Sequence, residues 1–484
     1  MLMRFALYSF AILLLTLAPL AVGQTAPIED SRADSTGDEA FSDELIFDDD
    51  LFNDDLFGGA FDDTEDTKDA SWLDGFTVRL SQQLFWQVNN HSVEPIPGLR
   101  IPKDADLENN RLGLNFKYQN AFAPGWLLQS TGQARWYWKD DYEYQANNDN
   151  IDTEYRINEL YLQRSFGQQS IKFGRQTVVW GETVGNSVLD VINHTEFRDF
   201  TIIDIEDARL NQWMLVWDVY GKDSQWSSFV NLYPEFNPTA VPGSPFYANT
   251  GYNVGDYKRG SDTLFEAGTQ WRKSFESSDI SFMAAYLYEN QLRYDYPVQG
   301  YGDAVAKKND FVLIGFSANR AIGKLLLNLD LALSLGVQPS ESPFPGVNVA
   351  GSSLETEKDQ IGASLGFEYA ISSDQSISLG VQANKVLNQS KDIAPQQMMV
   401  NEGIFGSWLV RYSNALSNGN LLITSTLQGD LAADSLFVAL GLDYSINDHW
   451  AVGGLIISTT ANQQTPMVMF DADVRVGATI TYSF

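Results

Sequence analysis

Acidic residues gather in one segment, residues 176–209, and basic residues recur in the segments before it. The acids are Asp190, Glu196, Asp199, Asp204, Glu206 and Asp207. The bases are Arg79, Arg111, Lys117 and Arg135, which sequence alternation places on the face opposite the apolar residues. Facing charges of this kind form ion pairs and a transverse electric field. The alternative is that a water-filled interior carries polar residues throughout, some of them basic by chance.

Residue types that would support catalysis or metal binding are sparse. The chain has no cysteine, which excludes disulfides, thiolate metal sites and a lipoprotein anchor. Its three histidines, His91, His194 and His449, lie far apart, and there is no HExxH or glycine-rich phosphate loop. An outer-membrane lipase or protease would need a nucleophile and a base, and no such pair is recognisable. We therefore expect no enzyme activity, no cofactor and no metal.

The elements that position the charges alternate with a period of two residues from Gly75 to the end. In residues 323–336, leucines at every second position from Leu325 to Leu335 face one way, and Asn328 and Asp330 face the other. A soluble sandwich can alternate in the same way. Strands are expected near 76–88, 110–119, 125–138, 153–165, 169–175, 211–220, 226–236, 263–274, 278–289, 309–320, 323–336, 357–371, 374–388, 403–413, 420–430, 434–446, 449–460 and 470–484.

The connections favour a membrane barrel over a sandwich. Tight links such as Asn447-Asp448 alternate with long polar ones such as 237–262, as in outer-membrane barrels. We predict an all-β transmembrane antiparallel barrel of about 18 strands, or 16 if 169–175 and 211–220 are not strands. A barrel of this size leaves an aqueous lumen unless something fills it. The 176–209 insertion is then the third outer loop, and we expect it to fold inward and narrow the lumen.

The two ends of the chain carry different signals. Residues 1–23 have the basic, apolar and small-residue parts of a cleaved signal peptide. Residues 24–75 hold 18 Asp and Glu against two basic residues, half of the formal charge of −32, which predicts a disordered acidic periplasmic arm and argues against a nucleic-acid partner. The barrel then occupies 76–484. Its last strand ends with Tyr482 and Phe484 facing outward, and it resembles the signal read by the barrel-insertion machinery; both termini are expected in the periplasm of a Gram-negative cell.

Apolar residues recur within the arm every five positions. They are Phe47, Leu51, Phe52, Leu56 and Phe57. In a helix Phe47 and Leu51 would share one face, as would Phe52 and Leu56, although so charged a segment should stay unfolded alone. We expect residues 41–61 to be a docking motif that folds on a basic periplasmic partner. A disordered spacer is the alternative.

The stretch from Ile171 to Trp217, which contains the loop, carries three short motifs: Phe173-Gly174-Arg175-Gln176, Val179-Trp180-Gly181-Glu182 and Asp190-Val191-Ile192-Asn193. Arg175 is expected to pair with a loop carboxylate, most simply Glu182, and so fix the base of the loop; an ordinary surface pair is the alternative. The motifs resemble a proteobacterial outer-membrane family encoded beside RND-superfamily exporters of hydrophobic or lipid-like cargo. The position of the loop also resembles the constriction loop of porins. The resemblance implies a conduit working with such a pump; the alternative is a passive porin for small polar solutes.

Overall fold

The computed structural model describes the barrel and part of the loops. The described residues are 75–96, 99–138, 153–183, 185, 187–196, 198–199, 201–202, 208–238, 252–253, 257–260, 262–295, 302–338, 357–387, 404–431, 434–462 and 465–484. The expected signal peptide, the arm up to residue 74 and its docking residues lie outside this part of the chain, as do Asp204, Glu206 and Asp207.

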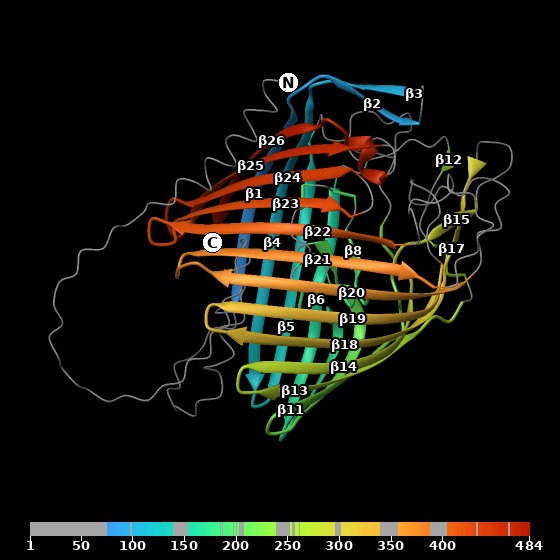
Figure 1. Cartoon of the computed structure of the whole chain (residues 1–484). Coiled ribbons are helices and arrows are strands. Elements are labelled where there is room, and N and C mark those ends of the chain that lie inside the picture. Colours follow the sequence, from blue (N-terminus) through green and yellow to red (C-terminus); the bar gives the residue numbers. More distant parts are fainter. Residues whose placement is uncertain are drawn as a thin grey trace. The chain divides into compact units, whose positions relative to one another are not determined.

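Eighteen antiparallel strands close into one barrel (Figure 1), which confirms the predicted fold. Each strand pairs with the next, and β26 pairs with β1 to close the ring. The strands expected near 169–175 and 211–220 are present as β7 and β10, so the count is 18. In ring order the strands are β1 (Phe76–Gln87), β4 (Leu107–Ala123), β5 (Trp126–Tyr137), β6 (Thr153–Phe166), β7 (Gln169–Gln176), β10 (Gln212–Tyr220), β11 (Ser224–Asn231), β13 (Glu266–Phe275), β14 (Ser278–Tyr288), β18 (Asp310–Ile322), β19 (Leu325–Val337), β20 (Lys358–Ala370), β21 (Gln375–Val386), β22 (Ile404–Leu416), β23 (Leu421–Asp430), β24 (Ser435–Ser445), β25 (Trp450–Ala461) and β26 (Val474–Ser483).

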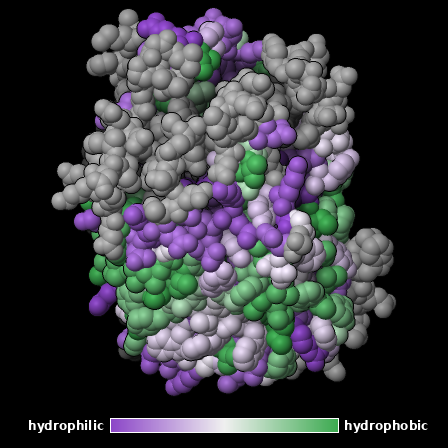
Figure 2. Space-filling model, turned by 90° about the vertical axis from the view of Figure 1, so that its right-hand side faces the viewer, coloured by the Kyte–Doolittle hydropathy of each residue, from purple (hydrophilic) through white to green (hydrophobic). Residues whose placement is uncertain are grey.

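Alternation divides each strand between two environments. In β19, Leu331 and Leu335 are exposed on the outside, while Asn328 and Asp330 are buried on the inside. Figure 2 shows the result on one face, where hydrophobic side chains gather below a belt of hydrophilic ones. An apolar exterior and a polar interior are what a barrel needs to sit in lipid around water.

Smaller elements belong to the connections between long strands. They are β2 (His91–Ile96) with β3 (Leu99–Lys103), β8 (His194–Thr195) with β9 (Arg209–Leu210), β12 (Tyr252–Asn253) with β16 (Gly302–Asp303), β15 (Arg293–Asp295) with β17 (Val305–Lys307), and the 3-10 helix η4 (Pro466–Phe470). The β8–β9 pair lies within the connection between β7 and β10. In the described part of the chain, no helix has the length and apolar character to cross a membrane.

The closing strand ends in a group of aromatic rings. The ring of Tyr482 lies 4.7 Å from that of Phe484 and 4.8 Å from that of Trp450. Phe484 is exposed, and its backbone N–H donates to the Val78 carbonyl across the seam. Tyr482 and Phe484 thus stand at the end that carries the short turns, and their recognition by insertion machinery stays a prediction.

Candidate functional site: a loop docked across the barrel lumen

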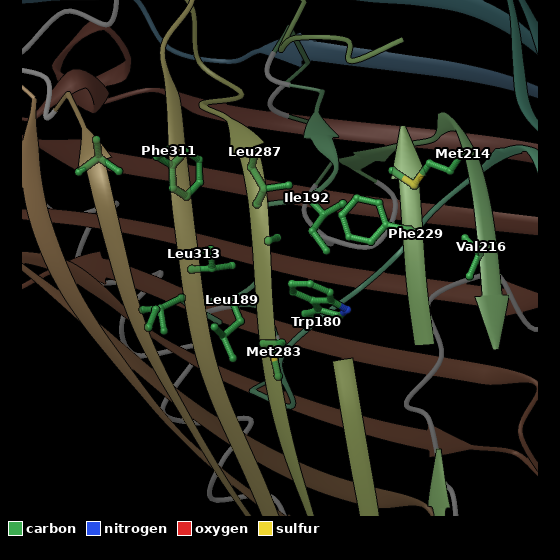
Figure 3. Packing of buried hydrophobic residues seen from close by; sticks show 14 residues of the cluster. Trp180, Leu189, Ile192, Met214, Val216, Phe229, Met283, Leu287, Phe311 and Leu313 are labelled. Atoms are coloured by element: carbon green, nitrogen blue, oxygen red, sulfur yellow. The ribbon is translucent and has the colours of Figure 1, made fainter. Parts of the chain in front are cut away.

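The 176–209 loop is built around Trp180. This side chain is 2 % exposed, and its ring meets that of Phe229 on β11 edge-on at 5.6 Å. Leu189 and Ile192 of the loop join it against inward-facing residues of β10, β11, β14, β18 and β19 (Figure 3). Burying an apolar side chain of this size contributes about 1.5–3 kcal/mol. The apolar residues of the loop therefore hold it against the barrel wall.

The wall is recessed to receive these side chains. A Cβ atom on Gly268 of β13 would lie 2.7 Å from the Trp180 ring, and one on Gly315 of β18 would lie 2.6 Å from Leu189 Cδ2. Real Cβ atoms do not approach so closely, so any larger residue would force the loop away from the wall. Glycine at these two inward positions fits the loop to the wall.

Asp330 on β19 anchors the backbone of the next loop residues. Its carboxylate is completely buried and accepts hydrogen bonds from the backbone N–H groups of Glu182, at 3.1 Å, and Thr183, at 3.0 Å. Ser317 on β18 donates a third, at 2.6 Å. Gly181 precedes these amides with φ +101°, a backbone conformation that residues other than glycine rarely adopt. The Trp-Gly-Glu motif thus combines an apolar anchor, a turn and an amide pair for one carboxylate.

The Asp190–Asn193 motif ties the loop to itself. Asp190 accepts from Arg209 at 2.9 Å, and burial, opposed by Arg209, raises the pKa of this carboxyl. The Asn193 side chain donates to the Val178 carbonyl at 2.9 Å and accepts from the Val178 N–H at 3.2 Å. These bonds join residues at the two ends of the loop to its middle, residues 190–193.

The second half of the loop is anchored by charge. Arg111 on β4 pairs with Asp199, and Arg156 on β6 pairs with Glu196 at 2.6 Å. Arg198 of the loop reaches Glu154 on β6 at 2.9 Å. Burial alone would raise the pKa of Asp199, but the guanidinium groups around it hold that pKa well below its usual range. The carboxylates here stay ionised and bind the loop to the β4–β6 wall.

His194 lies between these charges without carrying one. It is 5 % exposed, and burial, then the neighbouring Arg175 and Arg156, lower its pKa to about 3. The imidazole is neutral at physiological pH because protonating it would put an unsolvated cation beside two guanidinium groups.

The expected Arg175–Glu182 pair is wrong. Arg175 instead pairs with Glu235, beyond β11, at 2.7 Å. Glu182 pairs with Arg272 on β13, and burial, opposed by Arg272, raises the pKa of Glu182. Because Trp180 and Gly181 direct the chain toward β13 and β19, Glu182 points away from the base of the loop.

The expected basic face is present, but its members do different work. Register places Arg79, Lys117 and Arg135 on the same inner face as Arg111. Arg111 pairs with Asp199 of the loop, and Arg135 acts on Asp199 through its charge. Sequence reasoning missed Asp330, Arg156 and Arg198. An inward Asp in the leucine strand was a visible signal for the first, whereas the other two had none.

Metal chemistry has no support in the described residues, where no group of His, Asp and Glu is arranged to hold an ion. The site holds a loop in place across the barrel. Its chemistry is ion pairing, hydrogen bonding and apolar packing.

Solved structures with a similar fold are outer-membrane porins. OccAB1 of Acinetobacter baumannii aligns with a TM-score of 0.50 at 8% identity, covering 87% of this chain and 99% of that one. OccAB3 of the same organism gives 0.46 at 10%, covering 84% and 98%. OccK1 (OpdK) of Pseudomonas aeruginosa gives 0.46 at 11%, covering 85% and 99%. At such identities the likeness concerns the fold alone.

Comparison with curated proteins gave no match. A family model described as "Protein of unknown function (DUF1302)" matches residues 125–415, which include the whole 176–209 loop and most of its wall. The chain belongs to the DUF1302 family.

Proposed function

We propose that the protein is an outer-membrane channel for small polar solutes, narrowed by the 176–209 loop. One observation carries the proposal: the loop is attached to opposite walls of an 18-stranded barrel. Asp330 holds it on β19 and Arg111 holds it on β4. A barrel of this strand number is wide enough for an aqueous channel, so a loop across it sets the size of the opening.

The two faces of the wall support this function. Outward residues such as Leu331, Ile314 and Leu365 are exposed and apolar. Inward residues on the strands away from the loop's apolar anchor include many amides and hydroxyls, such as Gln83 and Gln382, beside the small apolar cluster of Phe85, Ala439 and Ile457. This division suits a barrel in the Gram-negative outer membrane with water inside.

Purified barrel in planar bilayers tests the proposal directly. Without any added protein, the wild type should give stepwise ion conductance, and liposomes that contain it should swell in solutions of small sugars. The same preparation after heat unfolding is the control. A folded, heat-modifiable barrel that neither conducts nor admits sugars would overturn the proposal.

A second candidate is a conduit that serves an RND-type exporter of hydrophobic or lipid-like cargo. The observation that favours it is the motif resemblance, in which Trp180 and Glu182 contact the barrel wall and Asp190 pairs with Arg209 within the loop. This candidate predicts that cargo leaves cells only when the pump is present and that the barrel alone is nearly closed to ions. Conductance of the isolated barrel therefore separates the two functions.

A further inference from the structure

The loop crosses the lumen from one wall to the wall opposite. Around the ring, β4 and β19 are nine places apart among eighteen strands, so they face each other across the axis. The loop binds Arg111 on β4 through Asp199 and Asp330 on β19 through its backbone. A segment attached at both points divides the interior into two sides.

One side is filled by packing. Inward residues of β14, β18 and β19 contact the loop's apolar residues. Every inward residue is buried from Ser281 to Leu287 on β14, from Phe311 to Ser317 on β18, and from Asn328 to Ser334 on β19. Val188 of the loop continues this contact onto β20, where its N–H donates to Ser364 at 2.9 Å. Well-packed apolar side chains leave no room for water, so this side is closed.

The other side mixes partly exposed inward residues with buried ones, among them an apolar cluster of Phe85, Ala439 and Ile457 on β1, β24 and β25. Gln83 on β1 is the cross-strand neighbour of Arg111, and Gln382 on β21 is the cross-strand neighbour of Ser364. Arg111 and Ser364 both contact the loop inside the barrel. Because cross-strand neighbours share a face, Gln83 and Gln382 face inward too. Gln83, Gln382 and Gln428 are all partly exposed, as is Thr479 on β26. Amides and hydroxyls donate and accept hydrogen bonds without charge.

We infer that the passage is eccentric: solutes cross between the 176–209 loop and the wall made by β21–β26 and β1. The space between the loop and β10–β19 carries none of the flow. The amides and hydroxyls of this lining can hydrogen-bond to small polar solutes. This inference rests on the proposed channel function and adds the route and the groups that meet the solute.

The absence of cysteine allows a matched test. Gln83, Gln382, Ala285 and Ala332 are each the eighth residue of a strand that runs in the same direction, and all four face inward. Single cysteines at Gln83 and Gln382 probe the open side. Single cysteines at Ala285, 5 % exposed, and Ala332, 8 % exposed, probe the closed side.

Each variant is treated in proteoliposomes with a cationic, membrane-impermeant methanethiosulfonate, and labelling is followed by mass spectrometry and by single-channel conductance. Gln83→Cys and Gln382→Cys should label quickly and lose conductance. Ala285→Cys and Ala332→Cys should label at least about tenfold more slowly, since the loop must first undock. Equal labelling on both sides, or a block only from Ala285→Cys or Ala332→Cys, would overturn the route. Labelling can be measured even if the barrel does not conduct ions. A non-conducting barrel would therefore count against the channel function, while the labelling rates would still test the route.

Discussion

Replacing Asp330 should release the loop from the wall. The carboxylate accepts from the N–H groups of Glu182 and Thr183, and each hydrogen bond to a charged acceptor contributes about 1.5–3 kcal/mol. Asp330→Ala therefore removes about 3–6 kcal/mol from docking. That shifts the ratio of docked to undocked loop by about 10²–10⁴ toward the undocked form. Asp330→Asn should weaken docking less, because its one carbonyl oxygen can still accept from both N–H groups, as Oδ2 does in the wild type, but without the charge.

Single-channel recording in planar bilayers measures the effect. We expect both variants to assemble as heat-modifiable barrels with larger or noisier conductance, since the strands keep their pairing. The control is Asn328→Ala on the same face of β19, whose amide donates to Glu368 at 2.8 Å on the neighbouring strand. If Asp330→Ala assembled and conducted like the wild type and like Asn328→Ala, the anchoring role of Asp330 would be refuted.

Three further predictions concern the wall, the loop and the arm. Arginine at Leu329, on the lipid face, should cost about 2–4 kcal/mol near mid-membrane and reduce the heat-modifiable form, whereas arginine at Asn328 stays inside and should assemble; equal losses would contradict the assigned faces. The pKa of His194 is lowered to about 3 in the docked loop, so His194 binds a proton more readily when the loop is undocked than when it is docked. Docking should therefore be strongest above about pH 6.5 and weaken by up to about 1.4 kcal/mol per pH unit below it, giving higher conductance at pH 5 that His194→Asn abolishes. Deleting residues 41–61 should abolish co-purification of a periplasmic partner and impair transport, and retention of both would make the arm a spacer.

The sequence by itself determined the wall and the place of the loop. A strand between lipid and water must alternate apolar and polar side chains, so the sequence alone predicts that Leu331 faces lipid and Asp330 faces the interior. The tight and long links between strands gave the strand number. A long segment without alternation had to leave the wall, which identified residues 176–209.

Only the tertiary structure decided which residues meet across the lumen. Arg175 pairs with Glu235, 60 residues away, and Glu182 with Arg272, 90 residues away, although Arg175 and Glu182 are near in sequence. The recess at Gly315 is equally invisible in the sequence, where a glycine in a strand has no stated neighbour. The physical reason is that alternation fixes the face of a side chain but not its height or its position around the ring. Those depend on strand register, on closure of eighteen strands and on the path of the loop, which together bring residues from distant strands into contact.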